Sequence, residues 1–301
     1  MENDGRDPYA DERTRHVPVM LREVLSWLSP RPGQTVVDGT LGGGGHTEAL
    51  LHAVLPDGKV LALDRDPIAV ARAKVRFAGL PVHLVQANFR DLPELLDELG
   101  WECVDGIVLD LGLSSDQLAD RDRGFSFSSD GPLDMRFDPQ EGEPAWRLVN
   151  RLNERALADL IHAFGEERFA RRIARAIAEE RRFREIKTAR ELTEIIHRVV
   201  PRPRFGGIDS ATRTFQALRI AVNKELDSLE SALKRIPEVL RPGGRLVVIS
   251  FHSLEDRIVK EAFRNDPRYS SLTKKPVTPA EEELTANPRS RSAKLRAAAR
   301  T

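Results

Sequence analysis

The chain has 301 residues, of which 40% are hydrophobic and 31% are charged, so it can bury a sizeable core beneath a strongly charged surface. Its formal net charge is zero, which excludes recognition of nucleic acid by overall positive charge and requires any basic surface to be local. The single cysteine, Cys103, excludes intrachain disulfides and cysteine zinc clusters, and the seven histidines show no metal-ligand spacing, so no metal site is expected.

The N-terminus and the apolar segments indicate where in the cell the protein is expected. The longest apolar stretch, near Leu246 to Phe251, is far too short to cross a membrane, and the N-terminus does not resemble a signal peptide. We therefore expect a soluble, cytoplasmic protein with no membrane partner. Residues 1–15 are polar and charged, which predicts a disordered leader. The sequence leaves the oligomeric state open, a homodimer included.

From residue 21 onward the sequence predicts alternating helices and strands. A first helix is expected over Leu21 to Leu28, before Pro30 and Pro32. Short apolar runs then predict four strands, with helical segments between them. The strands are expected at 35–38, 60–64, 82–86 and 104–110, and the helices at 46–53, 67–77 and 92–99. Such alternation is typical of an α/β fold with a mainly parallel sheet and helices on both faces.

The alternation stops after Asp110. The later segments are predicted in chain order as loops at 111–145, arginine-rich helices at 146–200, a linker at 202–209, one helix at 211–233, a turn at 241–244 and a strand at 245–250. The simplest organisation is a discontinuous α/β domain, 16–113 and 211–301, interrupted by a helical insertion at 114–210.

A glycine cluster follows the first predicted strand and opens the next helix. The segment is Val36-Val37-Asp38-Gly39-Thr40-Leu41-Gly42-Gly43-Gly44-Gly45-His46. Glycines at this position allow a ligand to approach the backbone, and the free N–H groups of the helix can bind it. The alternative is a tight turn with no ligand. Such a run of glycines would then lower stability without benefit, so we favour a nucleotide-like cofactor at the carboxyl end of the sheet.

The spacing of the glycines limits which cofactor binds. A dinucleotide fingerprint, Gly-x-Gly-x-x-Gly, would end at Thr47 or Glu48 here, so neither register fits. Asp38 at the strand end suits a cofactor that carries an amino group. Asp64 ends the second strand, 19 residues after Gly45. An acidic residue at that position usually holds ribose hydroxyls, although nicotinamide enzymes share this feature and strand-end aspartates also cap helices. Phe89 follows the third strand and either walls an adenine ring or packs beneath a helix.

Several separated motifs resemble those of the bacterial 16S rRNA cytosine-N4 methyltransferase family. They are His16-Val17-Pro18-Val19, Asp38-Gly39-Thr40 with Gly44-Gly45-His46, Asp64-Arg65-Asp66-Pro67, Asp110-Leu111-Gly112-Leu113-Ser114-Ser115-Asp116-Gln117, Arg123-Gly124-Phe125-Ser126-Phe127, Gly131-Pro132-Leu133-Asp134-Met135-Arg136, Gly165-Glu166-Glu167-Arg168, Thr212-Arg213-Thr214-Phe215-Gln216, Ser250-Phe251-His252-Ser253-Leu254-Glu255-Asp256-Arg257 and Asn287-Pro288-Arg289-Ser290-Arg291-Ser292. The resemblance runs from about His16 to the C-terminus.

This resemblance implies a Rossmann-like methyltransferase fold with S-adenosyl-L-methionine as cofactor. It implies methylation of N4 of the decoding-centre cytidine at the P site of 16S rRNA, within the small ribosomal subunit, which would tune decoding fidelity. The helical insertion is then expected to recognise the substrate. The cofactor contacts that it implies are Gly44, Gly45, His46, Asp64, Phe89, Asp110 and Gln117.

Asp110 ends the fourth strand beside the expected cofactor. Many amino methyltransferases carry Asp/Asn-Pro-Pro-aromatic at this place, and its oxygen accepts a hydrogen bond from the target amine. Here the sequence is Asp-Leu-Gly-Leu, without the prolines and the aromatic residue. Asp110 is therefore a candidate catalytic residue, but it could instead bind the amino group of the cofactor or cap the next turn.

Local basic and aromatic residues are candidate RNA contacts. Phe125 and Phe127 lie in a glycine-flanked loop and either stack on an extruded base or pack under the insertion. Arg168, Arg171, Arg172 and Arg175 recur at helical spacing and form either a phosphate contact or a solvated face. The tail after Asn287 contains no acid, which favours nucleic-acid contact by its basic residues: Arg289, Arg291, Lys294, Arg296 and Arg300.

Two other functions remain as alternatives. A DNA amino methyltransferase would share the fold and the cofactor, but such enzymes generally keep the Pro-Pro-aromatic motif that is missing here. A ribosome-assembly factor without catalytic activity would not need the glycine loop with Asp64 and Asp110. Calorimetry with S-adenosylmethionine distinguishes a cofactor-binding enzyme from such a factor.

Overall fold

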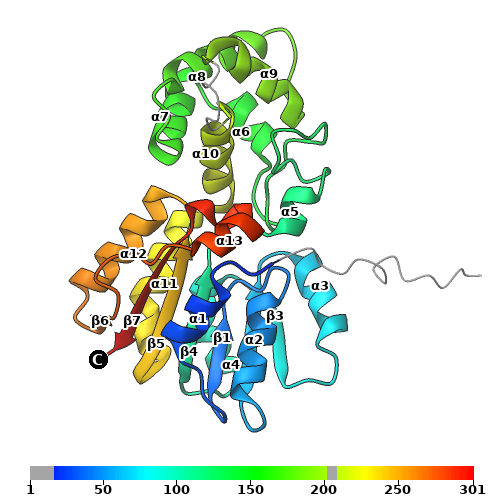
Figure 1. Cartoon of the computed structure of the whole chain (residues 1–301). Coiled ribbons are helices and arrows are strands. Elements are labelled where there is room, and N and C mark those ends of the chain that lie inside the picture. Colours follow the sequence, from blue (N-terminus) through cyan, green and yellow to red (C-terminus); the bar gives the residue numbers. More distant parts are fainter. Residues whose placement is uncertain (1–16, 202–208) are drawn as a thin grey trace, which may run out of the picture. The chain divides into compact units, whose positions relative to one another are not determined.

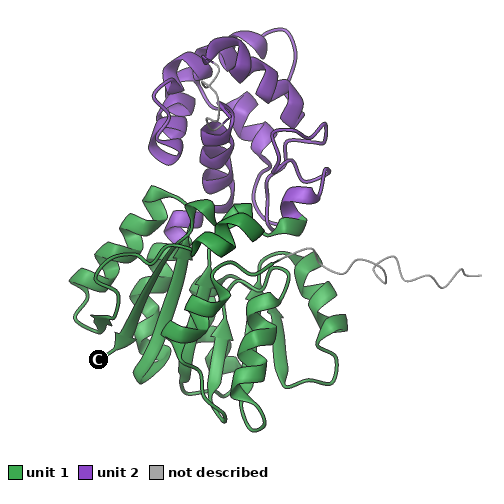
Figure 2. Cartoon of the chain, in the orientation of Figure 1, with its two compact units in different colours: residues 1–116, 228–301 green, residues 117–227 purple. Residues whose placement is uncertain are grey.

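The computed structural model describes residues 17–201 and 209–301. Contacts divide the chain into two compact units, drawn in green and purple in Figure 2. Unit 1 comprises the residues up to Asp116 and those from Ser228 onward, and unit 2 comprises residues 117–227. The leader predicted at 1–15 and nearly all of the linker predicted at 202–209 lie outside the described residues.

Unit 1 is built on a seven-stranded sheet with the order β3-β2-β1-β4-β5-β7-β6 (Figure 1). Its strands are β1 (Thr35–Asp38), β2 (Lys59–Asp64), β3 (Val82–Gln86), β4 (Val104–Asp110), β5 (Leu240–Ser250), β6 (Tyr269–Ser271) and β7 (Lys294–Arg300). The five strands from β3 to β5 pair in parallel, and β7 pairs antiparallel with β5 and β6. The mainly parallel α/β sheet expected from the sequence is confirmed, with β1 to β4 within one residue of their predicted bounds.

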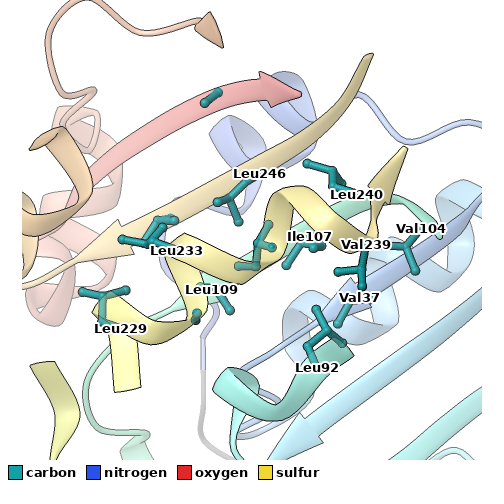
Figure 3. Close-up of a cluster of buried hydrophobic side chains, with 14 of the residues drawn as sticks. Val37, Leu92, Val104, Ile107, Leu109, Leu229, Leu233, Val239, Leu240 and Leu246 are labelled. Atoms are coloured by element: carbon teal, nitrogen blue, oxygen red, sulfur yellow. The ribbon is translucent and has the colours of Figure 1, made fainter. Parts of the chain in front are cut away.

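Alternate residues of the strands enter two different cores. On one face Val37, Ile107 and Leu109 pack with leucines of two helices, Leu92 and Leu233, as Figure 3 shows. On the other face Val36 and Val108 pack against helices near the N-terminus. Both faces of β1 and β4 are thus buried, which explains why these two strands are mainly apolar.

The helices of unit 1 lie on both sides of the sheet (Figure 1). They are α1 (Leu21–Leu28), α2 (Gly45–Val54), α3 (Pro67–Arg76), α4 (Leu92–Glu98), α12 (Ser253–Asn265) and α13 (Glu281–Ala286), together with the 3₁₀ turns η1 (Phe89–Asp91) and η2 (Pro288–Ser292). Helix α11 (Glu225–Val239) belongs to unit 1 from Ser228 onward.

The turn predicted at 241–244 is part of β5. The strand pairs Leu240 with Val104 and Arg245 with Gly106, so the intervening Arg-Pro-Gly-Gly forms an irregularity within the ladder rather than a separate turn. Proline and glycine are common at such bulges, which accounts for the turn-like signal.

Unit 2 consists of helices and loops. Its helices are α6 (Ala145–Arg151), α7 (Glu154–Gly165), α8 (Ala170–Glu180), α9 (Ala189–Val199) and α10 (Thr212–Asn223), and α5 (Ser115–Ala119) spans its first boundary. The helix predicted from Ala211 to Leu233 is two helices, because Lys224 adopts a left-handed conformation (φ 51°) between α10 and α11.

Helix α10 extends unit 2 beyond the predicted end of the insertion at residue 210. It packs along α7: Gln216 donates a hydrogen bond to the carbonyl of Phe164 (3.1 Å), and Gly165 lies against the backbone of Arg213. Local sequence patterns do not reveal this pairing, because it joins segments that are far apart in the chain.

Candidate cofactor site and active site

The glycine loop connects β1 to α2 and is organised by Asp38. One carboxylate oxygen of Asp38 accepts a hydrogen bond from the N–H of Thr40 (3.1 Å), and the other accepts from the hydroxyl of Thr47 (2.7 Å). The side chain is fully buried. Asp38 therefore ties together the two ends of the loop, and this role differs from the contact with a cofactor amino group that its position suggested.

Glycine is required within this loop for two different reasons. Gly44 precedes the first residue of α2, Gly45, with φ 78°, and a Cβ at Gly44 would lie 3.0 Å from the ring of Phe77. At Gly39 a Cβ would lie 2.4 Å from the side chain of Leu109 in β4. Larger side chains at Gly39 and Gly44 would collide with neighbouring elements, so the loop needs glycine at both positions to follow this path. The path leaves the first N–H groups of α2 at the carboxyl edge of the sheet.

Asp64 at the end of β2 faces this loop. Its carboxylate accepts hydrogen bonds from the N–H groups of Gly42 (2.8 Å) and Asp66 (2.9 Å), one on each oxygen. Burial raises the pKa of Asp64 to about 6, although both N–H groups favour the ionised form. Each oxygen keeps a lone pair, so the carboxylate is held in a fixed orientation and can still accept hydrogen bonds from a ligand.

Asp110 at the end of β4 lies beside His46, the second residue of α2. Asp110 Oδ2 is 3.7 Å from His46 Nδ1, and Asp110 N donates to the hydroxyl of Thr40 (2.6 Å). His46 Nε2 lies 3.1 Å from the carbonyl oxygen of Val19. A carbonyl oxygen only accepts, so Nε2 of His46 carries a proton and donates it to Val19, while Nδ1 faces Asp110.

The carboxyl group of Asp110 is only partly satisfied by the protein. Its Oδ1 is buried and has no hydrogen-bond partner among the residues that the structure describes. Burial raises the pKa of Asp110 to about 7, and His46 opposes this shift while the charges of Asp38 and Glu255 reinforce it. A buried oxygen without a donor is costly, so this atom is well suited to a ligand that brings an N–H group or a positive charge.

These features fit S-adenosylmethionine. Its ribose hydroxyls are the donors that Asp64 could accept, and its ammonium group, or the amine that it methylates, is the donor that Asp110 lacks. Phe89 begins η1 directly after β3, is half-buried, and lies against the position where a Gly39 side chain would stand. Phe89 also packs against the core, so the two interpretations of its ring both stay open.

The carboxyl end of β5 contributes a buried acid that the sequence reasoning did not single out. Glu255 in α12 accepts hydrogen bonds from the N–H groups of Phe251 (2.8 Å) and His252 (3.3 Å), and it forms a capping box with His252. Its charge acts on Asp110. The sequence signal for Glu255 is the motif from Ser250 to Arg257, which resembles the family pattern but does not by itself assign a role to this residue.

The other predicted site residues, namely the cofactor contact Gln117 and the two phenylalanines Phe125 and Phe127, belong to unit 2. Gln117 is buried in α5. Phe125 is also buried: its ring stacks on Phe137 with centroids 5.7 Å apart, and the guanidinium of Arg123 lies over it. Phe127 packs edge-on against Phe215 at 6.2 Å. For these two phenylalanines the structure favours the packing alternative, because stacking on a base would require them to leave these contacts.

The predicted basic face is largely on α8. Arg171, Arg172 and Arg175 are exposed on the helix, whereas Arg168 lies in the preceding turn with its guanidinium over Phe169. Arg175 is 3.7 Å from Glu154. The face therefore comprises three helical arginines and one that precedes the helix.

The expectation that nothing neutralises the C-terminal basic residues is wrong. Lys294–Arg300 forms β7, whose pairing with β5 brings Arg296 to 2.6 Å and Lys294 to 3.7 Å from Asp256 of α12. Arg289 and Arg291 lie in η2 and are exposed, with Arg289 hydrogen-bonded to Ser115. A distant acid neutralises part of this segment, which local charge counting could not detect.

The residues that the structure describes contain neither a cluster of metal-ligand side chains nor a membrane-spanning helix. No group of three or more His, Cys, Asp or Glu side chains there could hold a metal ion. No helix in residues 17–201 and 209–301 is long and apolar enough to cross a membrane.

Comparison with known proteins finds close relatives over nearly the whole chain. The model of the MraW methylase family matches residues 13–301. A protein of Thermomicrobium roseum named ribosomal RNA small subunit methyltransferase H is 51% identical, over 95% of this chain and 94% of the relative. A protein of the same name from Deinococcus deserti is also 51% identical, over 98% and 96% of the two chains.

Solved structures resemble the chain more distantly. A putative rRNA methylase from Clostridium thermocellum is 14% identical with a TM-score of 0.47, over 95% of this chain and 99% of that one. A putative methyltransferase from Streptococcus mutans in complex with SAH is 12% identical with a TM-score of 0.44, over the same shares of the two chains.

Proposed function

The chain belongs to the MraW methylase family, and on that premise we propose that it transfers a methyl group from S-adenosyl-L-methionine to the exocyclic N4 of the P-site cytidine in 16S rRNA. The names of relatives at about half identity, which refer to small-subunit rRNA, support the substrate class. The observation that carries the proposal is the unpartnered Oδ1 of Asp110 at the carboxyl edge of the sheet. A substrate in the small ribosomal subunit would place the protein in the cytoplasm.

The cofactor supplies a methyl group bound to a positively charged sulfur. In our proposal Asp64 accepts hydrogen bonds from the ribose hydroxyls, and the backbone at Gly44 and Gly45 follows the cofactor closely. The two N–H groups that already hold the Asp64 carboxylate fix its direction before the cofactor arrives. Such preorganisation lowers the entropic cost of binding and of positioning for an in-line displacement.

We propose that Asp110 accepts an N–H donor through its Oδ1. If the donor is the cytosine amine, the contact turns the nitrogen lone pair, which is delocalised into the ring, toward the methyl group. If the donor is the ammonium group of the cofactor, the contact fixes the cofactor. The nitrogen loses a proton after transfer, and Asp110, whose pKa burial raises to about 7, is an acceptor for that proton in this site.

The proposal is tested with purified protein and labelled S-adenosylmethionine on three substrates: small ribosomal subunits that lack the modification, a short hairpin of the decoding-centre sequence, and duplex DNA. We expect incorporation into small subunits, with N4-methylcytidine as the product, and much less into the hairpin. Because its net charge is zero, the protein lacks the general attraction for phosphate that binding a short RNA would need.

The other outcomes contradict the proposal in different ways. Preferential labelling of DNA would make the chain a DNA amino methyltransferase. Binding to small subunits without any incorporation would make it an assembly factor. Equal rates on the hairpin and the subunits would remove the requirement for an assembled particle.

A further inference from the structure

Phe183 is an aromatic residue on the surface of unit 2. Its exposed fraction is 88%, the highest among the exposed large hydrophobic side chains of the described residues, which otherwise are Val17, Val75 and Leu80. It stands in the turn that joins α8 to α9, two helices that pack side by side (Figure 1). A single exposed hydrophobic side chain is normal on a protein surface, so the residues around Phe183 decide whether its ring is a contact for a partner.

The surroundings of Phe183 are strongly basic. Residues 168–184 contain seven arginines and two glutamates. Arg171, Arg172 and Arg182 are exposed and form no ion pair within the described part of the chain. The buried residues of α8 are Ala170, Ile173, Ala174 and Ile177. The free arginines of the helix therefore lie on its opposite, outer side, and the spacing from Arg171 to Arg182 continues that side to the turn.

The turn itself is anchored, so it holds Phe183 outward. The N–H of Phe183 donates to the carbonyl of Glu180 (3.0 Å), and Arg181 donates to the carbonyl of Val149 (2.6 Å). The Glu180 carboxylate accepts from Arg198 and Arg184, which lowers its pKa. The Glu180 carboxylate is thus already paired with arginines. Glu179 is an exposed acid on the same helix, so the patch is positive by the excess of its arginines over its acids.

We propose that Phe183 stacks on an unpaired base of the substrate RNA while Arg171, Arg172 and Arg182 bind its phosphates. The inference rests on the proposed function. It extends the basic face predicted from the sequence to Arg182 and adds the exposed ring of Phe183 as the contact for a base. Exposed aromatic rings flanked by arginines are the usual combination for single-stranded RNA, since every base has a face on which a ring can stack. A second copy of the chain fits less well, because its own arginines would repel this patch.

The test compares Phe183→Ala, Phe183→Tyr and Val75→Ala, the last a change at another exposed hydrophobic residue (68%) in α3. We measure the Kd for small subunits, the KM and kcat of methyl transfer, the Kd for S-adenosylmethionine and the thermal unfolding temperature. Phe183→Ala should weaken subunit binding and raise KM by roughly tenfold, the value of one base stack. It should leave kcat, cofactor affinity and unfolding unchanged. Phe183→Tyr should restore binding, and Val75→Ala should change nothing.

A further variant and a further measurement complete the design. Arg182→Ala should lower the salt dependence of subunit binding by about one phosphate contact. Unchanged subunit binding and KM in Phe183→Ala would overturn the proposal. Dissociation of a dimer by Phe183→Ala in sedimentation, with unchanged KM, would assign the surface to a second copy instead. Because subunit binding is measured without methyl transfer, a wild-type protein that binds subunits but does not methylate them would contradict the proposed function and not this surface.

Discussion

At the scale of single residues, the proposed site contains two carboxyl groups that burial makes reluctant to ionise. The pKa of Asp64 is raised to about 6 and that of Asp110 to about 7. Main-chain N–H groups hold the Asp64 carboxylate, and the backbone N–H of Asp110 is bonded to the Thr40 hydroxyl. Both carboxyl groups gain from a ligand that brings donors or positive charge. This combination is characteristic of functional carboxyl groups, since a purely structural aspartate is normally satisfied by the protein itself.

We predict that Asp64→Ala weakens binding of S-adenosylmethionine by about 1.5–3 kcal/mol, because charge-assisted contacts to the ribose are lost. Calorimetry measures the affinity and circular dichroism checks the fold. Asp57→Ala, at an exposed aspartate, is the matched control and should bind like the wild type. Wild-type affinity in Asp64→Ala would remove the ribose assignment.

Asp110→Asn should lower the single-turnover rate of methyl transfer on the order of 100-fold while leaving RNA binding intact. Asparagine keeps an acceptor oxygen but loses the charge. Cofactor affinity that stays normal would indicate that Asp110 orients the target amine, whereas affinity that falls with the rate would indicate the cofactor ammonium. Asp110→Ala should be worse in both cases. Wild-type rates in both variants would leave Asp110 only a structural cap.

The raised pKa of Asp110 also predicts how stability depends on pH. Between about pH 4 and pH 7 the folded, cofactor-free protein holds a proton on Asp110 that the unfolded chain has lost, so this group makes the free energy of unfolding fall as the pH rises. Asp110→Asn should therefore be more stable than the wild type at pH 8, and the difference should shrink toward pH 4. Urea unfolding at both pH values measures this. A less stable variant at pH 8 would contradict the burial cost assigned here.

At the scale of elements, the sequence predicts those strands and loops whose positions are set by a local pattern of residues. Strands β1, β2 and β4 are largely buried apolar runs that end at an aspartate, and β3 is a partly buried edge strand that ends at Gln86. The sequence predicts all four within one residue of their observed bounds. The glycine loop and Asp64 were recognised in the same way, from spacing. Strand β7 was missed because its sequence, Lys-Leu-Arg-Ala-Ala-Ala-Arg, has no strand preference of its own and is extended only through its pairing with β5 and β6.

Long-range pairing explains the other misses. The break at Lys224 has neither glycine nor proline to indicate it. Phe125 is buried against Phe137 and Arg123. The neighbouring sequence does not distinguish a phenylalanine that packs inside the protein from one that binds a base. The neutralisation of Arg296 by Asp256 likewise depends on the position of a helix that precedes it by many residues.

The ion pair between Arg296 and Asp256 leads to a prediction for the stability of β7. Arg296→Ala should lower the free energy of unfolding by about 3 kcal/mol, because it leaves a mostly buried Asp256 with only Lys294 nearby. Its affinity for small subunits should be unchanged at temperatures where it is folded. Arg291→Ala, at an exposed residue of η2, should leave stability unaltered. Normal stability with weakened RNA binding in Arg296→Ala would restore the interpretation of this segment as a basic tail.

At the scale of the whole molecule, a chain with no net charge is proposed to act on one of the most negatively charged substrates in the cell. Its positive charge is local instead, above all on α8 and the turn that follows. An enzyme of this kind would bind RNA through shape and a few contacts, with a modest dependence on salt, and would need a folded particle to supply the shape.

The central claim is that this chain methylates one cytidine of 16S rRNA at N4, and mapping that nucleotide tests it most directly. The 16S rRNA is isolated from cells with the protein, without it, and with Asp110→Ala in its place, and the decoding-centre fragment is analysed by mass spectrometry. The account predicts that the N4-methyl group is present only with the wild-type protein and that Asp110→Ala behaves like its absence. An unchanged methylation state in cells without the protein, or a difference at another nucleotide alone, would contradict it.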